Sequence, residues 1–293
     1  MESHRDKALY VLSFMIVFLS IAVAAPGVFY TTGGAPFEVA NQYGDIVKMC
    51  GDGIYARDSY FRAPIFRGSD FVILFAAVPL LIVASMMDRK KKTLKQRLFL
   101  TSVIAVFTYY SASVAFGVTY NALHLLYIAL FSASFFGLVV AMTGLDYKKV
   151  EKSMAPALPY KGIYVFLALT GTALFAAWLP DIISALLANR SLAMIEVYTT
   201  EITYVLDMGI IGPAAVICLY LLKKRNGMGY VLLSMLLTIC LVIGVMLPVQ
   251  SLFQLSAGIS LPLPVLITKA GGFVALALFA LCLDIRFMKS VQE

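Results

Sequence analysis

Two ionisable residues of opposite sign, Asp207 and Lys269, lie deep inside apolar stretches of the sequence. At ~1.5 Å per helical residue, Asp207 lies about 24 Å from the basic end of its stretch at Lys223, and Lys269 lies about 25 Å from Arg286. An isolated charge at the centre of a bilayer costs ~2.5–3.5 kcal/mol even on lenient insertion scales, so opposite charges at one depth are natural partners. The sequence therefore predicts an intramembrane ion pair. Its role is either to fix helix packing or to act as a gate, a proton relay or a substrate anchor.

Further polar side chains are expected nearer the outer surface of the membrane. Tyr204 lies three residues before Asp207 and so shares its helix face. With the predicted ion pair, five side chains are expected to form a polar funnel open to the outside: Asp181, Glu201, His124, Asn121 and Tyr204. The alternative interpretation is that they are ordinary interfacial residues in contact with water.

The same sequence argues against several kinds of chemistry. It has only two histidines, His4 and His124, which excludes a bis-histidine haem within one chain and a His-rich metal site. No HExxH, GxSxG or Walker pattern is present. Paired spacings of the kind that bind zinc are also missing from the four cysteines, Cys50, Cys218, Cys240 and Cys282. We therefore expect no metal, no cofactor and no enzymatic centre.

Composition defines the class of protein. Of the 293 residues, 61% are hydrophobic and 13% are charged, whereas a soluble chain is about 45–50% apolar and about 25% charged. Apolar runs recur along the whole length, and each approaches the ~20 residues that a membrane-spanning helix needs. The sequence predicts an all-α polytopic membrane protein with eight transmembrane helices, at about 9–30, 70–87, 98–118, 121–143, 162–185, 203–222, 229–249 and 264–285.

The distribution of positive charge predicts how these helices are oriented. With eight spans, 17 of the 23 Lys and Arg residues fall on the side that holds both termini. The positive-inside rule then places the N- and C-termini in the cytoplasm. The net charge of +7 is accordingly read as a membrane-orientation signal and not as a nucleic-acid footprint. The first apolar stretch is too long for a signal peptide, so we expect it to be retained.

The chain divides into two similar halves. Residues 1–145 and 162–293 each give an outgoing helix, an outer segment, a returning helix and a helical hairpin, and a basic cytoplasmic linker, 146–161, joins them. In both returning helices a proline, Pro79 or Pro213, precedes the basic end by ten residues. Four helices per half would make a parallel 4+4 repeat. The outer segment 31–69 is expected to be an irregular loop or short helices that cap the outer face.

Four stretches resemble segments of an uncharacterised family of bacterial multi-pass membrane proteins. They are GIYARDSYF at 53–61, SDFVILFAAVPLL at 69–81, YNALHLLYIALFS at 120–132 and YVLDMGIIGP at 204–213. The resemblance covers most of the chain and implies a membrane fold, but that family has no assigned activity and assigns no functional residues.

We expect a protein of the plasma (inner) membrane whose partners are the lipid bilayer and a small solute or ion. The leading hypothesis is a transporter with an outward-facing polar site, because transporters built from repeats bind their cargo between the halves near charged groups. The alternative is a non-transporting sensor or assembly subunit, which would use its outer loop to bind a membrane protein partner.

Overall fold

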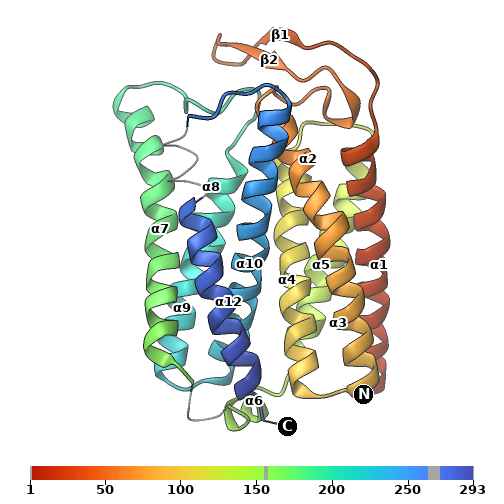
Figure 1. The fold of residues 1–293 in the computed structure, drawn as a ribbon, viewed down its shortest axis with the longest axis vertical. Helices are drawn as coiled ribbons and strands as arrows, with labels where there is room; N and C mark the ends of the chain where they lie inside the picture. Colours follow the sequence, from red (N-terminus) through yellow and green to blue (C-terminus); the bar gives the residue numbers. More distant parts are fainter. Residues whose placement is uncertain (1, 155–157, 263–270, 293) are drawn as a thin grey trace.

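The computed structural model describes residues 2–154, 158–262 and 271–292. It is a bundle of long helices with both ends of the chain at one end and a small β-hairpin at the other (Figure 1). We call these the basic end and the hairpin end, because the basic runs at the ends of α3 (Val78–Lys91) and α9 (Gly212–Lys223) lie beside the chain termini.

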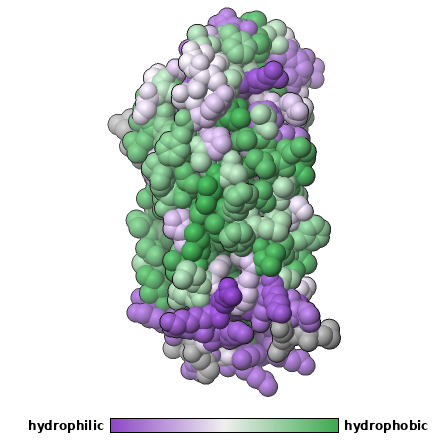
Figure 2. Space-filling model, turned by 90° about the vertical axis from the view of Figure 1, so that its right-hand side faces the viewer, coloured by the Kyte–Doolittle hydropathy of each residue, from purple (hydrophilic) through white to green (hydrophobic). Residues whose placement is uncertain are grey.

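Within the described residues, seven helical segments are long and apolar enough to cross a membrane. Many of their large apolar side chains, Phe14, Phe18 and Leu125 among them, are exposed on the surface of the bundle. Figure 2 shows this apolar belt between a hydrophilic basic end and a mixed hairpin end. The chain is thus an all-α multi-pass membrane protein. The candidate spans among the described residues are α1 (Glu2–Phe29), α2 with α3 (Ala63–Lys91), α4 (Leu94–Gly117), α5 (His124–Thr143), α7 (Tyr160–Leu187), α8 with α9 (Ile202–Lys223) and α10 (Gly227–Ser256).

The predicted eighth span, 264–285, is described only in part. Helix α12 (Gly272–Ser290) packs against α10 and α7, whereas residues 263–270, including Lys269, lie outside the described residues. The eighth crossing and the Asp207–Lys269 pair therefore stay predictions. The predicted linker contains a short helix, α6 (Tyr147–Lys152), whose first backbone N–H groups donate to Asp146.

Both returning helices contain a π-helical turn. The turn η2 (Ile73–Ala77) joins α2 (Ala63–Val72) to α3, and η3 (Asp207–Ile211) joins α8 (Ile202–Leu206) to α9. Each turn ends two residues before the proline that lies ten residues ahead of the basic end, Pro79 or Pro213. Proline has no N–H to donate and clashes with the preceding turn. A wider turn with i→i+5 hydrogen bonds accommodates it.

The outer segment is a folded cap with β structure in place of the expected irregular loop or short helices. Strands β1 (Phe37–Ala40) and β2 (Ile46–Met49) pair antiparallel, and the 3-10 turn η1 (Gly53–Tyr55) follows. Asn41 closes the hairpin, since its side chain accepts the N–H groups of Tyr43 and Asp45. The sequence prediction missed this local hydrogen bonding, which is typical of Asn in turns.

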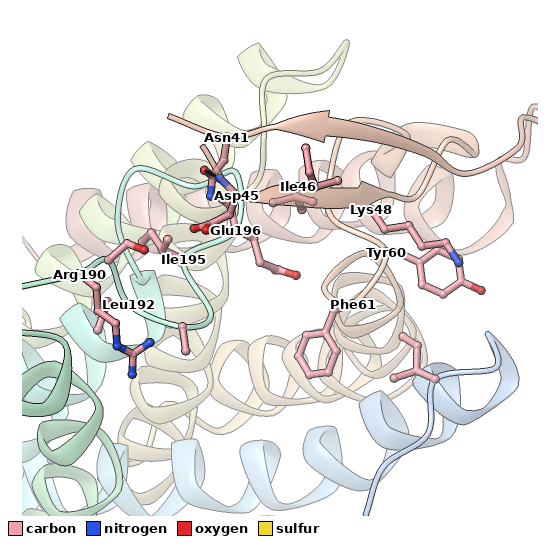
Figure 3. Close-up of a pocket in the computed structure, with 14 residues that line it drawn as sticks. Asn41, Asp45, Ile46, Lys48, Tyr60, Phe61, Arg190, Leu192, Ile195 and Glu196 are labelled. Atoms are coloured by element: carbon pink, nitrogen blue, oxygen red, sulfur yellow. Dashed lines mark hydrogen bonds between the residues drawn. The ribbon is translucent and has the colours of Figure 1, made fainter. Parts of the chain in front are cut away.

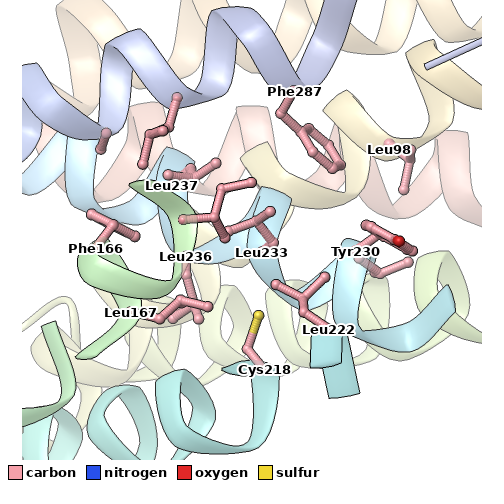
Figure 4. Close-up of a cluster of buried hydrophobic side chains, with 14 of the residues drawn as sticks. Leu98, Phe166, Leu167, Cys218, Leu222, Tyr230, Leu233, Leu236, Leu237 and Phe287 are labelled. Carbon is pink, nitrogen blue, oxygen red and sulfur yellow. The ribbon is translucent and has the colours of Figure 1, made fainter. Parts of the chain in front are cut away.

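The buried apolar side chains form two large cores. One lies among α1, α3, α4 and α5, and the other lies mainly among α7, α9, α10 and α12. Figure 4 shows the second core, with Leu233, Leu236 and Leu237 of α10 between the neighbouring helices. Helix α4 is the most buried of the seven spans and contributes to both cores. It also contacts α10 directly, where the hydroxyls of Ser102 and Ser234 lie 2.6 Å apart.

Candidate functional site

Asp207 is the first residue of the π turn η3, and it is buried. The Tyr109 hydroxyl of α4 donates to Asp207 Oδ1 at 2.8 Å, and the Trp178 indole N–H of α7 donates to Oδ2 at 2.9 Å. Buried polar groups must find such partners, because an unpaired one costs several kcal/mol in an apolar medium. Three helical segments thus converge on this carboxylate. Both partners are neutral, and the structure gives Asp207 no ion pair among the described residues.

A polar series leads from Asp207 toward the hairpin end. The ring of Tyr204 stacks on Trp178 with the ring centres 4.8 Å apart. The Tyr204 hydroxyl donates to Asp181 Oδ2 at 2.8 Å, and Asp181 is exposed. The structure therefore brings together three of the residues predicted from the sequence, Asp207, Tyr204 and Asp181, and connects the buried acid to the surface.

Glu201 belongs to a different cluster, which lies where the cap meets the 194–201 segment. The guanidinium of Arg62 contacts Glu201, lies 3.2 Å from Glu196 Oε2, and donates to the Met194 carbonyl at 2.6 Å. The Tyr198 ring lies under the same guanidinium, 4.4 Å from its central carbon. Arg62 thus ties the start of α2 to the 194–201 segment. We call these five residues the Arg62 cluster.

The last two predicted funnel residues, Asn121 and His124, lie in the first half of the chain. The Asn121 side chain accepts the Leu123 N–H and donates to the Tyr127 hydroxyl at 3.1 Å, which fixes the start of α5. His124 lies against the Tyr120 ring, with the ring centres 5.3 Å apart. Helix α5 packs on α1 and α4. The five predicted funnel residues are therefore divided among three places: the Asp207 series, the Arg62 cluster and the start of α5.

Beside Tyr127 lies an acid that the sequence analysis did not select, Asp70 of α2. It has no solvent exposure, and it accepts a hydrogen bond of 2.5 Å from the Tyr110 hydroxyl at Oδ1 and another of 2.5 Å from the Tyr55 hydroxyl at Oδ2. Gly27 of α1 faces the same carboxylate, and a Cβ there would lie 1.7 Å from Asp70 Oδ2. Asp70 was missed because the span was predicted to begin at residue 70, at headgroup depth, whereas the helix begins at Ala63.

Asp58 is a third buried acid and lies in the cap. Its Oδ1 accepts the Thr119 N–H and the Tyr198 hydroxyl, each at 3.0 Å. Its Oδ2 is buried and has no hydrogen-bond partner among the described residues. Burial raises the pKa of Asp58 to about 7, and Arg62 and the hydrogen bonds only partly offset this effect. Asp58 therefore changes its protonation state near neutral pH.

Stability should depend on pH through Asp58. The unfolded chain loses this proton near 3.8 and the folded chain near 7, so the folded state holds an extra proton between these values and loses stability as the pH rises across them. Asp58→Asn keeps the Oδ1 acceptor without the charge. We expect the thermal midpoint of the wild type to fall more steeply than that of Asp58→Asn between about pH 4 and about pH 7. Parallel midpoint curves from thermal scans in detergent would contradict this.

A cavity of about 610 Å³ opens at the hairpin end between the β-hairpin and the 190–196 segment (Figure 3). Charges of both signs line it, Lys48 and Arg190 against Asp45 and Glu196. Neither Asp207 nor Asp70 is in its lining, so it is a feature of the cap. Within the described residues, no group of three or more His, Cys, Asp or Glu side chains is placed to hold a metal ion.

Comparisons of the chain with known protein families, with curated proteins and with solved structures found no match.

Proposed function

We propose that the chain is a membrane transporter of a small solute or ion and that Asp207 lies at its binding site. The observation that carries the proposal is the environment of Asp207, a carboxylate buried in a π turn and held by neutral donors alone among the described residues. Ionisable groups inside membrane spans mark substrate and ion pathways more often than not, and π turns occur frequently at functional sites. The series through Tyr204 to the exposed Asp181 links this site to the hairpin end by a ring stack and a hydrogen bond.

In the proposed topology the basic end of the bundle faces the cytoplasm. The basic runs gather at the end of the bundle that holds both termini (Figure 1). By the positive-inside rule that end faces the cytoplasm of a plasma membrane, and the hairpin end faces outward. An eighth crossing that includes α12 completes this arrangement.

Three features support the parallel 4+4 repeat. Both outgoing helices, α1 and α7, contain a proline, Pro26 and Pro180. Both returning helices contain a π turn followed by a proline. The contacts between the halves are reciprocal, since α4 packs on α10, α2 packs on α10, and α8 packs on α4. In this arrangement Asp207 lies where the halves meet, because its tyrosine partner comes from α4 of the first half.

Flux measurements test the proposal. Purified protein in liposomes is screened with labelled sodium, potassium, amino acids and organic acids, and with a proton-sensitive dye. We expect flux for at least one probe, abolished by Asp207→Asn and unchanged by Glu151→Gln, the matched loss of an exposed acid at the basic end. Absence of flux for every probe class would count against transport.

Lys269→Met, alone and with Asp207→Asn, separates the roles of the predicted pair. A double variant that regains folded yield and full flux would show that the pair only fixes packing.

The cap supports a second candidate, a sensor or assembly subunit that binds a partner at the hairpin end. The cap is a packed structure with its own small core around Tyr55 and Tyr198 and an open charged cavity. If this is the function, deleting the hairpin 37–49 removes a partner from the purified complex, and Asp207→Asn leaves the complex intact.

A further inference from the structure

Among the described residues, Asp70 accepts hydrogen bonds from neutral donors alone. Its two oxygens each accept a tyrosine hydroxyl at 2.5 Å, and the Gly27 backbone closes a third side. The cation that acts on it from its own helix, Arg67, is bound to Asp52 at 3.1 Å. A carboxylate buried in a membrane helix without a bound cation is costly in its charged form. A proton is the smallest ligand that removes this cost.

The groups around Asp70 leave little room for a larger cation. A tyrosine hydroxyl already donates to each oxygen of Asp70. These O–H groups occupy the positions beside the carboxylate that a metal cation would need. The tyrosines come from the cap, α4 and α5, whereas α1 and α10 contribute no charge. The surrounding groups are Tyr55, Tyr110, Tyr127, Arg67, Gly27 and the neutral Gln250, which donates to the neighbouring Ser69.

Further titratable groups lie between Asp70 and the hairpin end. The buried Tyr127 hydroxyl lies beside that of Tyr55 and interacts electrostatically with both Asp70 and Asp58. Asp58, in turn, accepts the backbone N–H of Thr119 in the connection between α4 and α5. Its Oδ2, which has no hydrogen-bond partner among the described residues, and the Thr119 hydroxyl are both buried there. Around Asp58 the facing charged or titratable groups are Arg62, Tyr198 and Tyr127.

We propose that Asp70 is a proton-binding carboxylate, and that its proton arrives from the hairpin end by way of Asp58 and the hydroxyls of Tyr127 and Tyr55. In the transfer, the Asp58 carboxylic acid gives up a proton, each hydroxyl passes one on, and the Asp70 carboxylate becomes a carboxylic acid. No bond other than O–H bonds is made or broken. The coupling role of Asp70 rests on the proposed transport function. In that function the proton bound by Asp70 is the coupling ion.

Helix α4 links this proton site to Asp207. Tyr109 and Tyr110 are consecutive, and neighbouring residues on an α-helix point about 100° apart. Tyr110 therefore binds Asp70 while Tyr109 binds Asp207. The two carboxylates thus accept hydrogen bonds from consecutive residues of a single helix.

Infrared difference spectroscopy on the purified wild-type protein, between about pH 5 and about pH 9, tests proton binding without any need for transport. We expect a carboxylic acid C=O band that is lost in Asp70→Asn and retained in Asp207→Asn and Glu151→Gln. Asp58→Asn identifies the separate band of Asp58. Tyr110→Phe removes one hydrogen bond from the carboxyl group, and so it should shift the frequency of the Asp70 band even where Asp70→Asn fails to fold.

If folded Asp70→Asn shows every carboxylic acid C=O band of the wild type, the proposal is overturned. A Tyr110→Phe spectrum identical to that of the wild type would overturn it as well. A band that sodium or potassium titrates away would overturn it in favour of a metal-cation site. Coupling is tested separately by flux driven with a pH gradient. If Asp70→Asn loses the band while the wild type shows no flux, proton binding is established and transport is rejected. The failure of one proposal is therefore distinguishable from the failure of the other.

Discussion

Arg62→Met is expected to destabilise the cap by about 3–5 kcal/mol, the cost of removing one partner from a buried ion pair. Arg62 is largely buried and faces two acids, Glu196 and Glu201, whose side chains are also mostly buried. Without the guanidinium, these two carboxylates face each other across the cap with Ser59 as the remaining side-chain donor to Glu196. Hydrogen exchange over residues 37–62 and 190–201, together with limited proteolysis of the cap, measures the loss.

Arg67→Met is the matched control. Arg67 pairs with Asp52 at 3.1 Å, and both side chains are about twice as exposed as those of the Arg62–Glu201 pair, at 19% and 24% against 9% and 10%. Partly exposed pairs contribute ~0–1 kcal/mol. Equal losses of protection in the two variants would contradict the importance assigned to the Arg62 cluster.

Gly27→Ala is expected to cost at least about 3 kcal/mol, the upper end of the range for overpacked sites. The new methyl group would lie 1.7 Å from Asp70 Oδ2 and 2.7 Å from its Cγ. Two tyrosine hydrogen bonds hold that carboxylate in place, so either α1 moves away from α2 or the hydrogen bonds break. Thermal scans in detergent measure the stability, and the infrared band assigned to Asp70 reports the site itself.

Gly209→Ala controls for the same substitution where space is open, because a Cβ there meets no heavy atom within 4 Å. It should leave the midpoint nearly unchanged. Adding Asp70→Ala to Gly27→Ala removes the clashing oxygen and should recover part of the lost stability. A Gly27→Ala variant as stable as Gly209→Ala, with the wild-type band, would show that α1 does not constrain the Asp70 carboxylate.

The sequence predicted the helices well because bilayer thickness imposes a strong pattern on them. Seven of the eight predicted spans overlap helices that meet the length and hydropathy criteria. Their ends were less predictable. The second span begins seven residues earlier than expected, at Ala63. Its polar side chains find partners in the fold instead of ending the helix, since Arg67 pairs with Asp52 and Asp70 accepts hydrogen bonds from two tyrosines.

Some residues of the candidate site carry a sequence signal, and others do not. The number of residues between Asp207 and the basic end of its span indicated a buried acid, and Asp207 is buried. Helix periodicity placed Tyr204 on the same face as Asp207. The aromatic donors Tyr109 and Trp178 carry no sequence signal, since an aromatic residue in an apolar span resembles core packing. The single outer funnel requires Asn121 and His124 to approach Asp181, and helix packing alone decides that distance. The π turns also escaped prediction, because only hydrogen bonding in three dimensions distinguishes them from proline kinks.

The two π turns have a mechanical consequence. A π turn holds one more residue than an α-turn, so each returning helix stores a single-residue register slip just ahead of its proline. If that slip moved along the helix, the segment on its hairpin side would turn by about 100° and advance by about 1.5 Å. Asp70 lies on that side of η2, and Asp207 begins η3. Each acid would then swing away from its aromatic donors while the basic half of the helix stayed in place.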